Sequence, residues 1–324
     1  MMIVSTSGYI VECFGPYLAN GGNNDAQITK HVVDANRLNF QVGDNFIVDR
    51  GFRDSLDYLS KLGIHSKMPH FLVNKAQHTT KEANKNRLVT KVRWVVEAVN
   101  GVIKRWKYFA NVVSNLNIPH IESDFRIVCA LINKFRPART TSTENDQQLA
   151  AQMKKKANET NNLKLLVQKE KKLNKAARSI DVKKLCFPIL SENYIRELTF
   201  GVYQIKQAKS YTSEHLDQNG NYMFQFVLML PNLIQIRLQS RFASKKIHNI
   251  YIEFVRQTSN RNNQQLEPIK SWYCDCKAGA RVVGTCAHVA SVLWYLGVAI
   301  HDPEMLKERK CDKFMSLCQD ASDS

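Results

Sequence analysis

The sequence of 324 residues lacks the features that mark membrane and secreted proteins. No apolar run approaches the length of about 20 residues that a membrane-spanning helix needs. The first ten residues, MMIVSTSGYI, have neither the basic start nor the long apolar core of a secretory signal. Without a secretory route, the eight cysteines are expected to be thiols or metal ligands rather than disulfides. We therefore expect a nuclear protein, or otherwise a cytoplasmic one, with no membrane partner.

Acidic residues are scarce beside basic ones. The chain has 29 Asp and Glu against 46 Lys and Arg, so its formal net charge is +17. Such a balance favours a polyanionic partner, most often nucleic acid, so DNA is the expected partner. The alternative is a soluble basic surface without a specific ligand. The hydrophobic fraction of 44% is enough for real cores, and the length leaves room for two domains.

The front part of the chain, residues 1–136, is predicted to be globular, with mixed strand and helix patterns. MIVSTSGYIVECF indicates a hairpin around a Ser-Gly turn, and DNFIVDRGF holds a short strand that ends at Asp49. Apolar residues recur every three or four positions over 90–110, which predicts a helix.

The remainder divides into a linker, a second domain and a tail. Residues 137–185 are polar and basic, which predicts a partly helical, poorly packed linker. Residues 186–300 regain aromatic and β-branched residues, with a hairpin in YMFQFVLMLPNLIQIRLQS and a further strand in NIYIEFV. The tail, 301–324, carries no usable signal. The expected fold class is mixed, α+β or α/β, with a small β-rich second domain.

Four potential metal ligands lie within fifteen positions of this second domain: Cys274, Cys276, Cys286 and His288. The first two end the strand-like IKSWYC, and Gly279 and Gly284 would let the loop turn back. Thr285 is suited to cap a helix that starts near Cys286 and ends at Gly297. Two ligands from a strand end and two from a helix start form a closed tetrahedral zinc site, which predicts a structural Zn²⁺.

The alternative is that these residues are free core thiols and one surface histidine. Four potential ligands at paired close spacing argue against that alternative. The other five cysteines show no such pattern: Cys13, Cys129, Cys186, Cys311 and Cys318.

The motif Cys-x-Cys, a short loop and Cys-x-His, followed by an apolar helix, resembles the SWIM-type zinc finger over residues 273–297. The preceding stretch, LTFGVYQIKQAKSYTSEHL through SRFASKK, is similar to the region that accompanies this finger in transposon-derived proteins. SWIM fingers are associated with DNA binding and with protein contacts. The resemblance therefore implies DNA and possible protein partners.

The front part resembles the DDE domain of Harbinger-type transposases, through GGNNDAQIT, VGDNFIVDRGF and RWVVEAVNGVIKRWKYF. This resemblance implies an RNase H-like core in which two aspartates and a glutamate hold two Mg²⁺ or Mn²⁺ ions that cut a phosphodiester. By the same comparison, Asp49 matches the second catalytic aspartate and Glu97 the glutamate. Asp25 matches a further acidic position in the Gly-rich turn.

The first catalytic aspartate of that family lies on a strand upstream of the segment matched by MIVSTSGYIV. We therefore expect this chain to lack that aspartate and a central strand, and its Asp49 and Glu97 site to be incomplete. Without the resemblance, the i,i+4 spacing of Arg93 and Glu97 would indicate a surface ion pair on a helix. Asp49 would then be a turn residue.

Basic residues around the predicted Glu97 helix are the candidate DNA contacts: Arg93, Lys104, Arg105 and Lys107. Residues 151–185 would add a mobile cationic arm. Trp94 and Trp106 fit the apolar repeat and are expected in the core.

Two hypotheses about function follow. The first is a transposon-derived, zinc-binding, DNA-binding protein without complete catalytic machinery. The second is an active divalent-metal-dependent DDE endonuclease or transposase whose first aspartate lies upstream of this chain. A third reading makes the finger a protein-docking module without a role at DNA.

Overall fold

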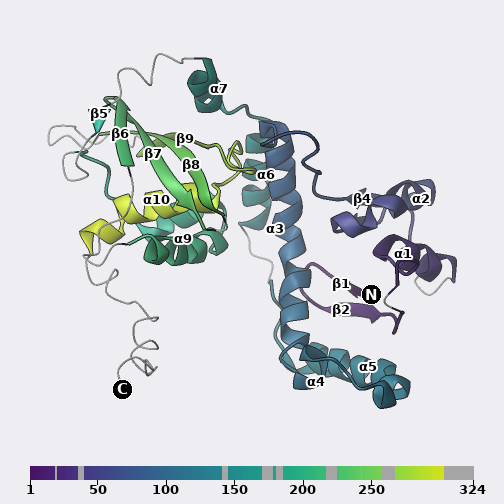
Figure 1. Ribbon diagram of the computed structural model, residues 1–324. Helices are drawn as coiled ribbons and strands as arrows, with labels where there is room; N and C mark the ends of the chain where they lie inside the picture. The colour runs from purple at the N-terminus through teal and green to yellow at the C-terminus, as the bar shows by residue number, and fades with distance from the viewer. Residues whose placement is uncertain are drawn as a thin grey trace, which may run out of the picture. The chain divides into compact units, whose positions relative to one another are not determined.

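The computed structural model of the chain describes residues 1–18, 20–35, 40–140, 145–169, 178–179, 185–216, 225–241, 243–256 and 267–302. The chain forms two compact units (Figure 1). The first unit is Met1–Phe71 with Lys85–Lys154, and the second is Leu72–Asn84 with Lys155–Ser324. Helix and sheet are mixed, as an α+β fold requires. Among the described helices, none combines the length and apolarity needed to cross a bilayer.

The predicted tail falls outside the described residues apart from His301 and Asp302, and so do Cys311 and Cys318.

The first unit contains two small sheets. β1 (Met2–Val4) pairs antiparallel with β2 (Ile10–Cys13), which confirms the predicted hairpin. β3 (Asn45–Ile47), close to the predicted short strand, pairs parallel with β4 (His65–Lys67). The connecting elements are α1 (Asp25–Asp34), η1 (Arg50–Ser55) and α2 (Leu56–Lys61).

The predicted helix over 90–110 is part of a longer one, α3 (Thr80–Ile103), which ends before Trp106. A separate short helix follows, α4 (Lys107–Ala110), then η2 (Asn115–Asn117) and α5 (Ile118–Phe135). The buried face of α3 contributes Val99, Val102 and Ile103 to a core shared with β2 and α5.

Helix α3 begins earlier than the apolar repeat indicates because Thr79 and Glu82 form a capping box. The Glu82 backbone N–H donates to the Thr79 hydroxyl at 3.2 Å, and the Thr79 backbone N–H donates to the Glu82 carboxylate at 2.9 Å. The bond from the Thr79 backbone lowers the pKa of Glu82 to about 2. A carboxyl group whose pKa is depressed on folding contributes stability above its ordinary pKa, and that contribution is lost as the pH falls toward 2.

The two tryptophans expected in the core are not there. Trp94 is 41% exposed and Trp106 is 43% exposed. The buried positions of α3 that follow Trp94 include Val95, Val99 and Val102, and Trp94 lies beside that stripe rather than in it. Trp106 lies beyond the end of the helix, where the three- and four-residue repeat no longer sets the direction of a side chain.

The second unit is built on an antiparallel sheet in the order β5-β6-β7-β8-β9. These strands are β5 (Arg178–Ser179), β6 (Gln225–Leu230), β7 (Leu233–Ser240), β8 (Ala243–Phe254) and β9 (Ile269–Cys274). The pairing of β6 with β7 confirms the second predicted hairpin.

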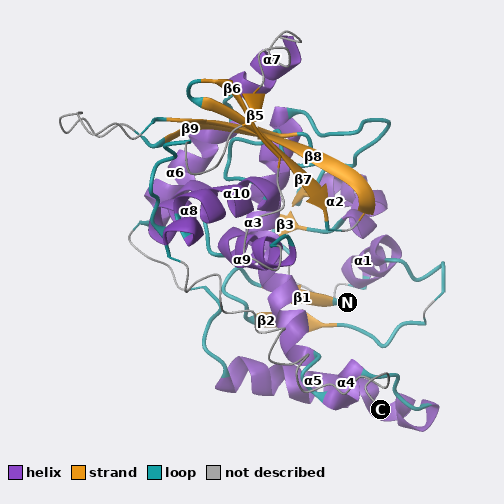
Figure 2. Cartoon of the chain, turned by 60° about the vertical axis from the view of Figure 1, so that its left-hand side comes forward, coloured by secondary structure: helices purple, strands orange, loops and turns teal. Residues whose placement is uncertain are grey.

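Helices cover both faces of this sheet. On one face lie α8 (Glu192–Thr199), α9 (Tyr203–Glu214) and α10 (Ala287–Gly297), as Figure 2 shows. Their buried side chains form one core with alternate residues of β7 and β8. After α10, η5 (Ala299–His301) closes the described chain.

The range predicted as a linker contains two helices, α6 (Asp146–Ala157) and α7 (Asn162–Lys169). The start of α7 is packed rather than solvated. Leu163 is buried in a cluster with Leu233, Tyr251 and Tyr273 on the second face of the sheet. A few apolar residues in this polar stretch therefore dock it on the sheet despite its composition.

Candidate metal centre and carboxylate site

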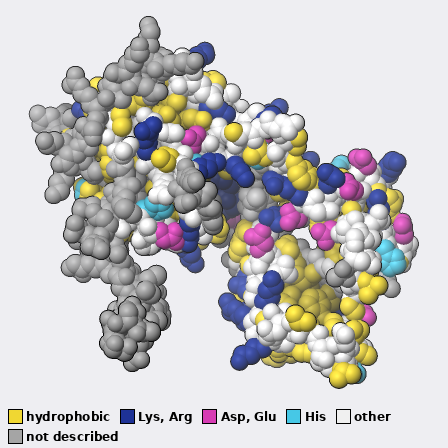
Figure 3. Space-filling view, viewed as in Figure 1, with side chains coloured by type: hydrophobic (Ala, Val, Ile, Leu, Met, Phe, Trp, Pro, Cys, Tyr) yellow, Lys and Arg dark blue, Asp and Glu magenta, His cyan; other side chains and the backbone are white. Residues whose placement is uncertain are grey.

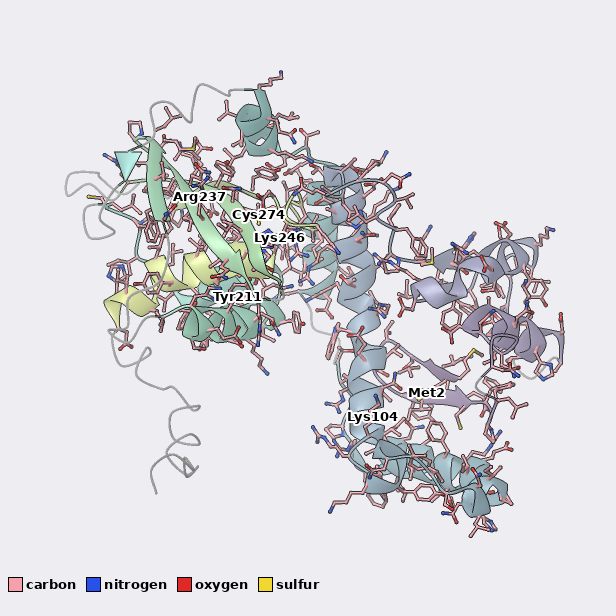
Figure 4. The ribbon with its side chains drawn as sticks, in the orientation of Figure 1. Met2, Lys104, Tyr211, Arg237, Lys246 and Cys274 are labelled. Carbon is pink, nitrogen blue, oxygen red and sulfur yellow. The ribbon has the colours of Figure 1, made fainter. Side chains whose placement is uncertain are left out.

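The four predicted metal ligands come from a strand end and a helix start, as their spacing indicates. Cys274 is the last residue of β9, and Cys276 lies in the turn that follows. Cys286 is the N-cap of α10, and His288 lies in the first turn of that helix. The four ligand atoms all lie within 4.8 Å of one another (Cys274 is labelled in Figure 4). We call these four residues the ligand set, and residues 274–286 the metal loop.

The spacing within the ligand set fits a zinc ion. The Cys274 Sγ and His288 Nδ1 atoms are 3.7 Å apart. A tetrahedral zinc bound at about 2.3 Å to sulfur and about 2.0 Å to nitrogen would hold such a pair about 3.5 Å apart. The Cys276 backbone N–H also points at Cys274 Sγ at 3.4 Å, a contact that favours a thiolate.

The metal loop needs glycine at two positions. Gly284 has a φ of +68°, and a β-carbon there would press on the Thr199 backbone. A β-carbon at Gly279 would collide with the carbonyl group of Cys274. The Gly279 N–H donates to Cys276 O at 3.0 Å and its carbonyl accepts from Cys274 N–H at 3.1 Å, which closes the turn.

Replacing Gly279 by alanine is expected to open this turn, because the new methyl group has no room beside Cys274. We expect the variant to lose about 1–3 kcal/mol of unfolding free energy, as for other overpacked sites. Urea denaturation measures this loss. The control is Gly101→Ala, since Gly101 lies in α3 with no neighbour within reach of an added methyl group. That change should leave stability equal or higher, and equal losses in the two variants would contradict the role of Gly279.

Thr285 does not cap α10 as expected. Cys286 is the N-cap, and the buried Thr285 hydroxyl has no hydrogen-bond partner among the described residues. Cys286, a predicted metal ligand, occupies the N-cap position, which shifts the helix start by one residue.

The thiols of the ligand set hold one another in unequal protonation states. Burial raises the pKa of Cys274 well above its ordinary value. Hydrogen bonds from Cys274 and Cys276 lower the pKa of Cys286 well below it. The guanidinium group of Arg281 is buried close to the three sulfurs. Without an ion these shifts favour a thiolate at Cys286 alone, and a bound cation would favour deprotonation of the other two thiols as well.

Further residues around the ligand set were not foreseen from the sequence. The His288 ring packs edge-on against the Tyr211 ring, with 5.1 Å between the ring centroids. The centroid of the His248 ring lies 4.3 Å from that of His288. Asp275, between the two cysteines, lies 3.1 Å from His248 Nδ1 and accepts hydrogen bonds from Asn249. The only local signal was the acid within the Cys-Asp-Cys triplet.

The first unit brings the two predicted catalytic carboxylates together. Asp49 caps η1 directly after β3, and Glu97 lies in α3. Arg93 bridges them, with Nη1 3.2 Å from Asp49 Oδ2 and Nη2 2.7 Å from Glu97 Oε1. The i,i+4 ion pair and the meeting of the two acids are therefore both present. Arg93, also predicted as a DNA contact, pairs with both acids.

A cavity of about 820 Å³ opens beside these carboxylates. Asp25, Asp49 and Glu97 line it, and so do β1 and β3. Within the described residues, β1 pairs only with β2 and β3 only with β4, so each strand has an unpaired edge. Figure 3 shows hydrophobic side chains gathered where β1 and β2 lie in Figure 1.

The other three predicted DNA contacts lie together at the end of α3. Lys104, Arg105 and Lys107 are exposed, and no ion pair among the described residues involves them. We call them the α3 basic cluster (Lys104 is labelled in Figure 4). The exposed Trp106 lies within the cluster in sequence.

Residues 1–133 match the family model described as DDE superfamily endonuclease. This match supports a transposase-derived nuclease domain in the front part of the chain. No curated protein matches the chain, and neither does any solved structure.

Proposed function

We propose that the chain is a Harbinger-type, transposon-derived protein that binds DNA and carries a structural Zn²⁺ in a SWIM-type finger. The observation that carries this proposal is the convergence of three sulfurs and one imidazole nitrogen within 4.8 Å. Closed structural zinc sites have four such ligands, and three thiolates with one imidazole are one of the usual combinations.

The ligand set fits a zinc ion in chemistry as well as in spacing. Bound there, the ion would supply folding energy rather than catalysis, because protein ligands fill all four tetrahedral positions. Cys274 and Cys286 would connect the end of β9 to the start of α10. The positive charge of Arg281 would offset the net negative charge of a centre with three thiolates.

DNA binding is supported by the positive chain and by the α3 basic cluster. Cations without acidic partners are free to contact phosphates, and each contact adds salt-dependent affinity. Trp106, between Arg105 and Lys107, offers an exposed aromatic face for an unstacked base. A protein that acts on chromosomal DNA would be nuclear, which is the proposed location.

We propose that the first unit retains the endonuclease fold but lacks a complete set of catalytic carboxylates. Asp49 and Glu97 are the two carboxylates in the described residues that match the catalytic pattern, and Arg93 forms an ion pair with each of them. Asp25 also lines the cavity, but it matches the Gly-rich turn rather than a catalytic aspartate. With two matched carboxylates to hold the ions of a two-ion cleavage, we propose DNA binding without cleavage.

One observation favours the alternative, an active endonuclease. The cavity beside Asp49 and Glu97 is lined by residues of β1 and β3, and among the described residues each of these strands has an unpaired edge to which a further strand carrying an acid could add. Mg²⁺ or Mn²⁺ held by a completed set would stabilise the attacking and leaving oxygens of the phosphate. In that case Asp49 and Glu97 would hold and orient the ions.

The experiment measures the metal content and DNA reactions of the purified full chain. The proposal expects about one equivalent of zinc and retention on a DNA column at moderate salt. It expects no Mn²⁺-dependent nicking of plasmid. Nicking that disappears in Glu97→Gln would establish the alternative. Zinc without DNA retention would favour a protein-docking finger, and absence of zinc would overturn the proposal.

A further inference from the structure

Residues 72–84 lie in the front part of the sequence, yet they belong to the second unit together with the ligand set. Their side chains contact the backbone of the metal loop, nearly two hundred positions away. Asn161, just before α7, contacts the same loop. Three carboxamide side chains from two distant segments therefore meet around the residues that would hold the metal.

Gln77 joins the two residues of the first ligand pair. Its Nε2 donates to Cys274 O at 2.7 Å and to Cys276 O at 2.8 Å. Its Oε1 accepts from the Tyr273 hydroxyl at 3.2 Å. Next to it, the backbone N–H of His78 donates to Lys277 O at 3.1 Å. The Cys-x-Cys turn is thus held by donors from outside its own segment.

Asn84 holds the far side of the loop. Its side chain is fully buried, and its Oδ1 accepts from the backbone N–H groups of Val282 at 2.9 Å and Val283 at 3.2 Å. Its Nδ2 donates to Ala157 O at 3.2 Å. The stretch that leads to Cys286 is thereby tied to the first turns of α3.

Asn161 holds the middle of the loop to the strand before it. The side chain is 3% exposed, and its Nδ2 donates to Trp272 O at 2.9 Å and to Ala280 O at 3.2 Å. Its Oδ1 accepts from the backbone N–H of Lys164, as the N-cap of a helix does.

The metal loop pairs only some of its backbone groups internally, so each carboxamide side chain supplies part of what a sheet ladder would otherwise provide. A loop already fixed in shape also loses less conformational freedom when its side chains bind an ion. Both effects act on the backbone of the metal loop, and that backbone sets the distance between the Cys274–Cys276 pair and the Cys286–His288 pair.

We propose that Gln77, Asn84 and Asn161 are positioning residues that hold the metal loop in its metal-binding conformation. Metal binding in turn fixes segment 72–84 and the first turn of α3, which starts at Thr80. The coupling is reciprocal. If the docked segment raises metal affinity by a given factor, the bound metal raises the equilibrium constant for docking of the segment by the same factor. This inference rests on the zinc binding proposed above.

The test uses the full chain and the isosteric variant Gln77→Glu. Glutamate keeps the shape of the side chain but removes both donated hydrogen bonds and directs negative charge at two carbonyl oxygens. We expect zinc affinity, measured by competition with a chromophoric chelator, to fall about 10- to 100-fold, as for other groups that orient ligands. The thiolate–Co²⁺ absorption band of the cobalt-loaded variant should also change.

The matched control is Gln27→Glu, which introduces the same charge at an exposed glutamine of α1 in the first unit. It should bind zinc as the unaltered chain does. Equal zinc affinity in Gln77→Glu and the control would overturn the inference, even with zinc present in both. Absence of zinc from the unaltered chain would instead overturn the proposed function.

Hydrogen exchange of the unaltered chain gives a second readout that needs no variant. Removing the metal with a chelator should raise exchange in residues 72–84 more than in strands β7 and β8. Unchanged protection of 72–84 after metal removal would contradict the coupling.

Discussion

With zinc bound as proposed, we expect the replacement of Cys286 by serine to abolish zinc binding and destabilise the second unit. Cys286 is buried in the same core as Cys274 and Cys276, at the N-cap of α10. Structural zinc contributes apparent binding free energies of about 10–16 kcal/mol in finger peptides, comparable to the whole stability of a domain. We expect the unfolding temperature of this unit to fall by more than about 10 °C. Metal analysis and calorimetry measure the two effects.

The matched control for this variant is Cys186→Ser, which changes an exposed thiol of the same unit. It should retain zinc and its unfolding temperature. The hydrophobic core of the second unit includes Phe254, Leu293 and Leu296, so compact structure can persist without metal. The assignment of the ligand set would be contradicted if Cys286→Ser still bound a full equivalent of zinc. It would also be contradicted if this variant lost zinc but kept the unfolding temperature of the unaltered chain.

Replacing the α3 basic cluster by alanine will weaken DNA binding by roughly two to three orders of magnitude at 0.1 M salt. The three cations are exposed and without acidic partners among the described residues, so each is available for a phosphate. The dependence of log affinity on log salt should become shallower by about 2.7, which is about 0.9 for each contact. Fluorescence anisotropy over a salt series measures both.

The control removes three other exposed cations of the first unit, Lys61, Lys67 and Lys134, and so lowers the net charge equally. A purely non-specific attraction to the positive chain would respond alike to both triple variants. If log affinity depended on log salt with the same slope in both triple variants, the α3 basic cluster would not be a specific DNA contact. Trp106→Ala separates stacking from charge, because it should weaken single-stranded DNA binding without a change in slope.

The sequence predicted the parts of the fold that depend on neighbouring residues. Both hairpins follow from alternation of apolar residues around a short turn, and the strand-end and helix-start origins of the ligand pairs follow from their spacing. The capping box at Thr79 and Glu82 was also readable, and it would have placed the start of α3 correctly.

What the sequence could not predict depends on residues far apart in the chain. Gln77 and Asn84 show no local sign of contact with the metal loop, since an isolated carboxamide in a polar stretch is usually solvated. The meeting of Asp49 with Glu97 came from resemblance to a family, and the dual pairing of Arg93 needed coordinates. Trp94 was wrongly predicted to lie in the core because the apolar repeat shows which side of a helix is buried but not how wide the buried stripe is.

The contacts of Gln77 also constrain the order of events during synthesis. Its partner Cys276 follows it by 199 positions, so the ribosome adds that stretch in roughly 10 to 40 seconds at about 5–20 residues per second. Throughout that interval the nascent chain holds residues 72–84 without the loop they bind. The opening turn of α3 thus reaches its final contacts only after nearly two hundred further residues have been translated.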